Sequence, residues 1–498
     1  MALALSGLSG RHGADARTPA ALPGMPPPFL GVAIVGSGRR SAAVDAYGDV
    51  VDLRAPGPAG RALVAVPAKR QAAGTVPTSA GFVARARLSR GRTLPLWRAD
   101  SVRQRYVPGT NVLLTVARFG VGSAAVVRRI ESAEDGVPVS AGQGSPRLSR
   151  TIQADRRWLA RAQPLGRAAP RWARAMYRRS LLVLRALTDR RTGAVAAGAR
   201  DGWAYVWPRD AATVALAFAA AGYRPEAQRV TRFLTHLDLD AAARFDGTGA
   251  PVPGRGAQGD AAGWVAAAAQ AVGLRAPRPG AGWQGRADYQ EGEAGDYLGN
   301  ALASPGDGTK TAPYVPKPAR RPAESPVAVA FGTARGLMRI AGDPSSGLDS
   351  AAAWAVRPFP LPALFPAVRR TLLRLAARRE SRFGIAPSEA WSGGEDPWTA
   401  PTAWTAWALA ALARDAGGED TDAGGRRSAR GDRRAALSLM ADLRRAATPL
   451  GLLPERVDAR TGLPTSTTPL AWSHAFAILA LRELWPQTCR GKRAHMGA

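Results

Sequence analysis

The chain has 498 residues, of which 46% are hydrophobic, enough for a sizeable core and too many for a disordered chain. Its formal net charge of +30 comes almost entirely from arginine, since only four of the 68 basic residues are lysines. The arginines are spread along the whole chain, and no nucleic-acid-binding motif accompanies them. We therefore expect no specific nucleic-acid partner.

The single cysteine, Cys489, excludes an internal disulfide and fits a reducing compartment. The first ten residues contain a short apolar run without the basic start of a signal peptide, and no stretch reaches the roughly 20 uninterrupted apolar residues of a membrane helix. These features predict a cytoplasmic protein that does not cross a membrane. The start of the chain, residues 1–28, is rich in Pro, Gly and Ala and is expected to be disordered. The sequence leaves the oligomeric state open.

Residues 29–155 are predicted to form a small β-sandwich domain. Short β-branched runs separated by glycine-containing turns fill residues 31–54, and two further apolar runs, 111–118 and 122–130, are split by glycine. Several short strands with turns at this spacing are typical of a β-sandwich.

Residues 165–488 are predicted to be helical. In residues 168–188 large apolar side chains recur at helical spacing. Similar segments follow at 209–222, 224–238, 260–273, 325–341, 366–379, 399–415, 428–446 and 470–485. Long loops rich in Gly and Pro separate some of them, at 243–260, 274–324, 380–398 and 447–469, and residues 417–427 read as a polar surface loop. Loops of this length inside a compact domain are usually functional. The pattern fits a ring of helical hairpins with its site in the loops, and periodicity alone also allows an irregular bundle.

Four loop segments combine Trp, Asp, Glu and Arg, the side chains that bind sugar rings and hydroxyl groups. They are residues 205–210, 258–260, 288–293 and 451–458. Three of them have a plainer explanation as well: Asp210 and Asp260 could serve only as helix-start residues, and 288–293 could be a solvated acidic loop. A helix start does not account for Trp207 and Arg209 beside Asp210. Glu455 follows a proline in an apolar run, an unusual place for a carboxylate that is merely solvated.

At these segments the sequence resembles glycoside hydrolase family 15, which contains glucoamylases, glucodextranases and some bacterial trehalases. The matching motifs occur in the family's order: Trp207-Pro-Arg209-Asp210-Ala-Ala, Gln258-Gly-Asp260, the Gly-Gly-Glu-Asp-Pro-Trp-Thr run of 393–399, Leu-Leu-Pro-Glu455-Arg-Val-Asp of 452–458, and Pro-Leu-Ala-Trp472-Ser-His-Ala of 469–475. Residues 34–48 and 106–113 look like the β domain of bacterial members. The resemblance implies a mainly α fold, an (α/α)6 barrel preceded by a small N-terminal β-sandwich domain.

The resemblance also implies roles for individual residues. Glu455 matches the general base, and Arg209 with Asp210 matches the pair that grips the terminal glucose. Glu291 occupies the place of the general acid, although Gln290 stands where the family has Trp; Glu293 and Glu324 are the other candidates for the acid. The predicted sugar-binding residues are Trp207, Arg209, Asp210, Gln258, Asp260, Trp283, Tyr289, Glu293, Trp391, Trp398 and Trp472.

The activity implied is release of glucose from a malto- or isomalto-oligosaccharide, or from trehalose, by an inverting mechanism that needs no metal and no cofactor. Inversion requires two carboxyl groups roughly 6.5–9.5 Å apart. A second hypothesis, motivated by Gln290, is a catalytically decayed carbohydrate-binding protein on the same scaffold. A third is a basic nucleic-acid-associated protein, which would show salt-dependent binding. The four histidines are dispersed, so His474 is expected to be a packed, hydrogen-bonded residue and not a metal ligand.

Overall fold

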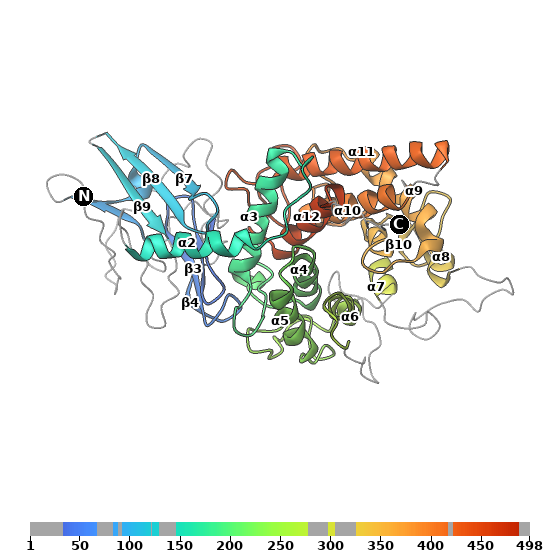
Figure 1. Cartoon of the computed structure of the whole chain (residues 1–498), viewed down its shortest axis with the longest axis horizontal. Helices are drawn as coiled ribbons and strands as arrows, with labels where there is room; N and C mark the ends of the chain where they lie inside the picture. The colour runs from blue at the N-terminus through green and yellow to red at the C-terminus, as the bar shows by residue number, and fades with distance from the viewer. Residues whose placement is uncertain are drawn as a thin grey trace, which may run out of the picture.

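The computed structural model describes residues 33–66, 83–87, 92–120, 122–128, 146–276, 297–303, 325–416 and 422–487. Within them, a part built of strands precedes a part built of helices, and the two lie side by side along the long axis of the molecule (Figure 1). This order agrees with the sequence prediction of a β domain followed by a mainly α domain. The segment expected to be disordered, 1–28, and Cys489 lie outside the described residues.

The N-terminal part contains small antiparallel sheets. Four strands pair in chain order: β1 (Ala33–Gly36), β2 (Ser41–Val44), β3 (Val50–Ala55) and β4 (Arg61–Ala65). A second sheet joins β7 (Ser101–Tyr106), β8 (Leu113–Phe119) and β9 (Gly122–Arg128), and β5 (Arg85–Arg87) pairs with β6 (Thr93–Pro95), which leads into the 3-10 helix η2 (Leu96–Arg98). These sheets agree in part with the predicted β-sandwich.

Buried side chains with paired hydrogen bonds join the two larger sheets to each other and to the helical part. The Tyr106 hydroxyl accepts from the Ile34 N–H and donates to its carbonyl, both at 2.8 Å. Asn111 donates through Nδ2 to the carbonyls of Gly36, at 3.0 Å, and of Leu182, at 2.8 Å, and Leu182 belongs to the first barrel helix. Because Asn111 is buried, these bonds fix the orientation of the β part on the helical part.

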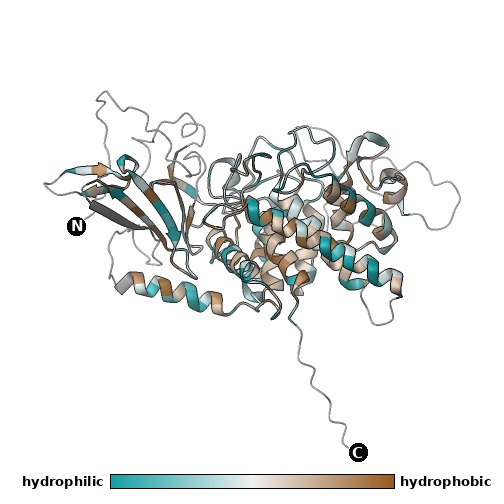
Figure 2. Cartoon of the chain, turned by 90° about the horizontal axis from the view of Figure 1, so that it is seen from above, coloured by the Kyte–Doolittle hydropathy of each residue, from teal (hydrophilic) through white to brown (hydrophobic). Residues whose placement is uncertain are grey.

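Six inner elements of the helical part contact one another in a closed ring within the described residues. In order they are α4 (Pro208–Ala220), α6 (Ala261–Val272), α7 (Leu298–Ala303), the 3-10 helix η4 (Ser350–Ala355), α10 (Thr399–Asp415) and α12 (Ala471–Leu484), which packs back on α4. These elements are buried on nearly every side, which explains why α10 is composed almost entirely of Ala, Thr, Trp and Leu up to Ala413. The hydrophobic residues accordingly concentrate at the centre of the helical part (Figure 2).

Outer helices pack against this ring, and all of them except the short apolar helix Pro326–Phe331 present a polar face to solvent. They are α3 (Arg171–Leu187), α5 (Arg224–Thr235), α8 (Pro326–Phe331), α9 (Phe365–Arg378) and α11 (Ala423–Ala446). The remaining short elements are α2 (Pro146–Ala160), η3 (Asp201–Trp203), β10 (Met338–Ile340), β11 (Asp343–Leu348) and η5 (Pro362–Leu364). The alternation of inner and outer elements is consistent with an (α/α)6 barrel. The close packing has a clear signature at Gly263, where an added Cβ would lie 1.5 Å from the Ala303 carbonyl of the neighbouring inner helix.

Three local expectations are wrong. The expected loop 274–324 contains the inner helix α7 (Leu298–Ala303), which packs between α6 and η4. A single helix was expected over 325–341, but α8 ends at Phe331 and β10 pairs with β11. Gly336 has a φ of +146° and lies against Thr371, a conformation and a contact that a continuing helix would not allow. In the expected loop 417–427, α11 begins at Ala423, because the Asp422 carboxylate caps it by accepting from the Gly425 N–H at 2.7 Å. No helix among the described residues is both long and apolar enough to span a membrane.

Candidate functional site

A cavity of about 440 Å³ lies where three inner helices begin. The residues preceding α4, α10 and α12, namely Trp207, Trp398 and Leu470, all line it. Their N-terminal ends carry partial positive charge, which favours negative or hydrogen-bond-accepting groups in the cavity. The other lining residues are Ala197, Gly202, Trp203, Arg209, Asp210, Arg244, Arg255, Gln258, Trp391, Gly393, Glu455, Arg456, Ser466 and Trp472.

Glu455 lies on the cavity wall in a hydrogen-bonded setting. Its Oε1 accepts from Trp203 Nε1 at 3.2 Å, and its Oε2 accepts from the Ser466 hydroxyl. Burial raises the pKa of Glu455, while the bonds from Ser466 and Trp203 and the charge of nearby Arg456 lower it. The backbone holds the residue in place, because the Glu455 carbonyl accepts from the N–H of Thr399, the first residue of α10, at 3.0 Å. A carboxylate held between donors in this way can accept a proton from a bound water.

Arg209, Asp210 and Asp260 form a buried charged network beside Glu455. Arg209 Nη1 donates to Asp260 Oδ2 at 2.8 Å, and Arg209 Nε lies 3.8 Å from Asp210 Oδ2. The guanidinium of Arg209 also lies over the Trp472 ring, 4.8 Å from its centroid. Burial raises the pKa of Asp210 to about 7, with Arg209 opposing this and the charges of Asp260 and Glu455 adding to it. Asp210 therefore keeps its proton to a higher pH than an ordinary aspartic acid does.

The plainer explanation of the two aspartates as helix caps does not hold. Asp210 lies in the first turn of α4, where the cap residue is Trp207 and no side chain caps the helix. Asp260 precedes α6 in the cap position, but its side chain makes no capping hydrogen bond, and its Oδ2 accepts from Arg209. Both carboxylates therefore belong to the charged network.

Tryptophans form an apolar wall along the cavity. Trp391 and Trp398 meet edge to face at 5.5 Å, and Trp404 meets Trp472 in the same way at 5.3 Å. The buried indole N–H groups of Trp207, Trp398 and Trp472 have no hydrogen-bond partner within the described part of the chain. Such donors suit a ligand that carries several hydroxyl groups.

A smaller cavity of about 30 Å³ shares Trp391, Trp398 and Trp472 with the first and adds Arg339 and Asp349. Asp349 precedes η4 and caps it by accepting from the Ala351 N–H at 2.7 Å. Burial raises the pKa of Asp349 to about 6, opposed by this hydrogen bond and by the charge of Arg339. The guanidinium of Arg339 lies 4.8 Å from the centroid of the Trp391 ring.

His474 has a structural position, as expected. It is fully buried, with Nδ1 2.9 Å from the Ser180 hydroxyl and Nε2 accepting from the Leu453 N–H at 3.0 Å. Burial and the charge of Arg179 lower the pKa of His474 to about 3, so the ring is neutral. Because Leu453 lies two residues before Glu455, His474 anchors the loop that carries this carboxylate.

The structure brings together sequence-predicted residues from segments far apart in the chain. Trp207, Arg209, Asp210, Gln258, Trp391, Trp398, Glu455 and Trp472 line the cavity, and Asp260 lies behind it on Arg209. The predicted acid Glu291, its alternatives Glu293 and Glu324, and the predicted sugar-binding Trp283 and Tyr289 lie outside the described residues. The sequence reasoning missed Trp203, Arg255, Arg456, Ser466 and Asp349. Asp349 had a usable signal, because an Asp directly before a small-residue inner helix repeats the pattern of Asp260.

Among the described residues, no group of three or more His, Cys, Asp or Glu side chains is arranged to hold a metal ion. The cavity instead offers two carboxylates, several guanidinium groups and indole rings. This combination of donors and acceptors suits a neutral polyhydroxylated ligand.

The chain is similar to known proteins in fold and in one sequence segment. A bacterial glucoamylase solved in complex with acarbose shares 13% identity, with 97% of this chain and 96% of that chain covered and a TM-score of 0.57. A glucoamylase from Saccharomycopsis fibuligera shares 14% identity over 64% of this chain and 96% of that chain, with a TM-score of 0.48. A wild-type glycosidase shares 20% identity over 63% and 97%, also with a TM-score of 0.48. No curated protein sequence matches the chain.

The fold is therefore that of the bacterial glucoamylase, with β-sheets followed by a helical barrel. Residues 171–242 match the family model described as Glycosyl hydrolases family 15, and this segment contains the Trp207-Pro-Arg209-Asp210 motif. The resemblance to glycoside hydrolase family 15 is thus confirmed, and it supports a glycoside hydrolase.

Proposed function

We propose that the protein is an inverting glycoside hydrolase that releases glucose from the end of an α-glucosidic substrate, with Glu455 as the general base. The observation that carries the proposal is the position of Glu455, a carboxylate between two side-chain donors on the wall of a tryptophan-lined cavity. The family match supports the reaction class. The volume of about 440 Å³ falls within the range of roughly 300–1,000 Å³ typical of small-ligand pockets.

Glu455 acts in its ionised form. It accepts a proton from a water molecule, and the water oxygen attacks the anomeric carbon of the terminal sugar from the face opposite the departing group. The hydrogen bonds from Trp203 and Ser466 favour the charged carboxylate against the cost of its burial. They also hold the carboxylate plane, which orients the attacking water.

Arg209 and Asp210 hold the terminal sugar. The salt bridge to Asp260 orients Arg209, and its remaining N–H groups donate to sugar hydroxyls. Asp210, with its pKa of about 7, can either donate to a hydroxyl or accept from one near neutral pH. Gln258 and the tryptophans Trp207, Trp391, Trp398 and Trp472 complete the binding site, and Trp283, Tyr289 and Glu293 are proposed as further sugar-binding residues.

The general acid is proposed to be Glu291, which protonates the departing glycosidic oxygen. This assignment rests on its place in the motif order, with Glu293 and Glu324 as alternatives. In an inverting enzyme the acid would lie roughly 6.5–9.5 Å from Glu455, leaving room for the water.

The proposal is tested by glucose release from maltotetraose, isomaltotriose and trehalose. We expect turnover on at least one substrate and its loss by about 10²- to 10⁴-fold in Glu455→Gln, with an unchanged melting temperature. Glu291→Gln, Glu293→Gln and Glu324→Gln are compared in parallel, and the acid is the position whose loss abolishes turnover.

A second candidate, a catalytically decayed carbohydrate-binding protein, is favoured by Gln290 in place of the family's Trp. It predicts that folded wild-type protein binds maltotetraose in calorimetry but turns over none of the three substrates.

A further inference from the structure

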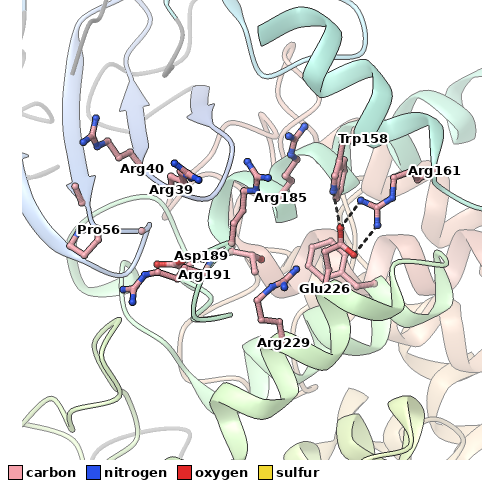
Figure 3. Close-up of a pocket in the computed structure, with 15 residues that line it drawn as sticks. Arg39, Arg40, Pro56, Trp158, Arg161, Arg185, Asp189, Arg191, Glu226 and Arg229 are labelled. Atoms are coloured by element: carbon pink, nitrogen blue, oxygen red, sulfur yellow. Dashed lines mark hydrogen bonds and ion pairs between the residues drawn. The ribbon is translucent and has the colours of Figure 1, made fainter. Parts of the chain in front are cut away.

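A second and larger cavity, of about 940 Å³, lies at the junction of the β part and the helical part. Its walls come from the turn between β1 and β2, the segment after β3, the end of α2, the end of α3 with the loop after it, and α5. Figure 3 shows the lining side chains converging from both parts. None of its lining residues lines the cavity that contains Glu455.

Arginine dominates the lining of this cavity. Seven of the 15 lining residues are arginines: Arg39, Arg40, Arg161, Arg185, Arg190, Arg191 and Arg229. The lining carboxylates are Asp189 and Glu226. Asp155, which is not part of the lining, pairs with Arg185 from behind. Among the described residues, seven cationic groups thus stand against three carboxylates.

The nearby carboxylates are already engaged. Glu226 accepts from Trp158 Nε1 at 3.1 Å and pairs with Arg161, also at 3.1 Å (Figure 3). Asp189 accepts through Oδ1 from the backbone N–H groups of Arg191, at 2.7 Å, and Thr192, at 3.2 Å. The side chains of Arg190, Arg191 and Arg229 make no ion pair with any residue in the described ranges. Within the described residues the positive charge of these three guanidiniums is therefore not balanced by an ion pair.

Arg185 shows that the cavity is built and not merely a charged surface. Its side chain is only 7% exposed and is fixed by a 2.7 Å ion pair with Asp155. Its buried Nε has no hydrogen-bond partner within the described residues. Burial lowers the pKa of Arg185, Asp155 opposes this, and the like charge of Arg190 lowers it further. An anion between Arg185 and Arg190 would relieve this repulsion.

The two aromatic residues that line the cavity, Trp158 and Phe218, argue against a stacked nucleobase, because Phe218 is only 1% exposed and Trp158 is covered by its neighbours. Trp158 stacks on Tyr223 with ring centroids 4.3 Å apart, and the Arg185 guanidinium lies 4.9 Å from the Trp158 ring centroid. Single-stranded nucleic acids are usually held by aromatic rings on which bases can stack, and the Trp158 ring is already covered. The groups offered to a ligand are guanidiniums, which bind phosphate oxygens in a bidentate manner.

We propose that this junction cavity binds a small molecule carrying two or more phosphate groups. Arginines from four separate segments surround the cavity, which is too large for one phosphate group to span. Each phosphate group of the ligand therefore contacts a different set of arginines. The ligand bridges the β part, through Arg39 and Arg40, to the helical part, through Arg190 and Arg229. It thereby stabilises the arrangement of the two parts.

The test is calorimetric titration of the full chain with inorganic triphosphate, fructose 1,6-bisphosphate and orthophosphate. Arg190→Ser/Arg229→Ser is compared with a matched control, Arg370→Ser/Arg374→Ser, which removes two exposed arginines from α9 at the far side of the helical part (Figure 1). We expect saturable binding of triphosphate or bisphosphate, much weaker binding of orthophosphate, and a loss of about tenfold in affinity per cavity arginine. The control should bind like wild type.

Triphosphate binding with no bisphosphate binding would identify a condensed phosphate, and the reverse would identify a phosphorylated sugar. Equal losses in the cavity variant and the control would reduce the effect to general electrostatics and overturn the proposal. No binding of any phosphate compound would overturn it as well. A further outcome is that a single-stranded oligonucleotide binds more tightly than triphosphate and loses the same affinity in Arg190→Ser/Arg229→Ser. That result would overturn the small-molecule proposal in favour of a nucleic-acid ligand.

Discussion

Replacing Trp203 by Phe tests whether the hydrogen bonds on Glu455 set the pH dependence of activity. The Trp203 indole donates to Glu455 Oε1 at 3.2 Å, and this bond stabilises the ionised carboxylate more than the protonated one. Phe keeps an aromatic ring at the same place but donates nothing. A hydrogen bond to a charged group contributes about 1.5–3 kcal/mol, and about 1.4 kcal/mol corresponds to one pH unit. Because Ser466 still donates to the other oxygen, we expect the lower end, about one pH unit.

The direction follows from the role of Glu455. A general base works when ionised, so the rate falls as the pH drops below its pKa. Loss of the Trp203 donor raises the pKa of Glu455, and the acidic limb of the kcat/KM profile moves to higher pH. The activity loss is therefore largest at low pH and small near neutrality. The assay is kcat/KM for glucose release measured from about pH 3.5 to pH 8.

The matched control is Trp172→Phe, which removes a partly buried indole from the outer helix α3, away from the cavity. Its pH profile should coincide with that of wild type. An acidic limb that stays in place in Trp203→Phe, or that moves equally in both variants, would refute the reasoning.

Three further predictions follow from the buried groups. Arg209→Met leaves the Asp260 carboxylate, only 1% exposed, without its cation, and should lower the free energy of unfolding by about 3–5 kcal/mol. Calorimetry should show that Arg209→Met/Asp260→Leu regains most of this stability but not sugar binding. An Arg209→Met variant as stable as wild type would contradict the prediction. Asp210 has a folded pKa of about 7, above its unfolded value, so its contribution to stability is complete below about pH 4 and is lost as the pH rises through 7. The melting temperature of Asp210→Asn should therefore fall less than that of wild type over this pH range. Parallel curves of melting temperature against pH for the two proteins would contradict the prediction. His474→Leu leaves the Leu453 N–H without its acceptor, at a cost of about 1–3 kcal/mol in the free energy of unfolding, and should lower kcat more than it raises KM. An unchanged kcat in folded protein would show that His474 does not position Glu455.

The strongest sequence patterns predicted the barrel helices best. Long amphipathic or all-apolar segments such as 399–415 and 470–485 correspond to α10 (Thr399–Asp415) and α12 (Ala471–Leu484) almost to the residue. Short inner elements escaped prediction, because a six-residue helix such as α7 (Leu298–Ala303) is shorter than two helical turns and shows no period. Its helical state depends on contacts with its neighbours, as the packing of Gly263 on Ala303 shows.

Within the site, the residues found in advance were those that lie in recognisable motifs. Arg209, Asp210 and Glu455 could be named, and the structure places them around one cavity. Trp203 and Ser466 could not be named in advance, because they matter only through their hydrogen bonds to the Glu455 carboxylate. In the sequence they lie 252 and 11 positions from Glu455, respectively. Hydrogen bonds between distant segments leave no local sequence period.

The most direct test of the central claim is the anomeric form of the first glucose released, followed by proton NMR before mutarotation. With maltotetraose or isomaltotriose the inverting mechanism predicts β-glucose as the initial product for wild type, and with trehalose equal amounts of β- and α-glucose, because the departing glucose keeps its α configuration. Release by Glu455→Gln should be slower by about 10²- to 10⁴-fold. Initial release of α-glucose from maltotetraose or isomaltotriose, α-glucose alone from trehalose, or β-glucose formed at the wild-type rate by folded Glu455→Gln, would contradict inversion with Glu455 as the general base.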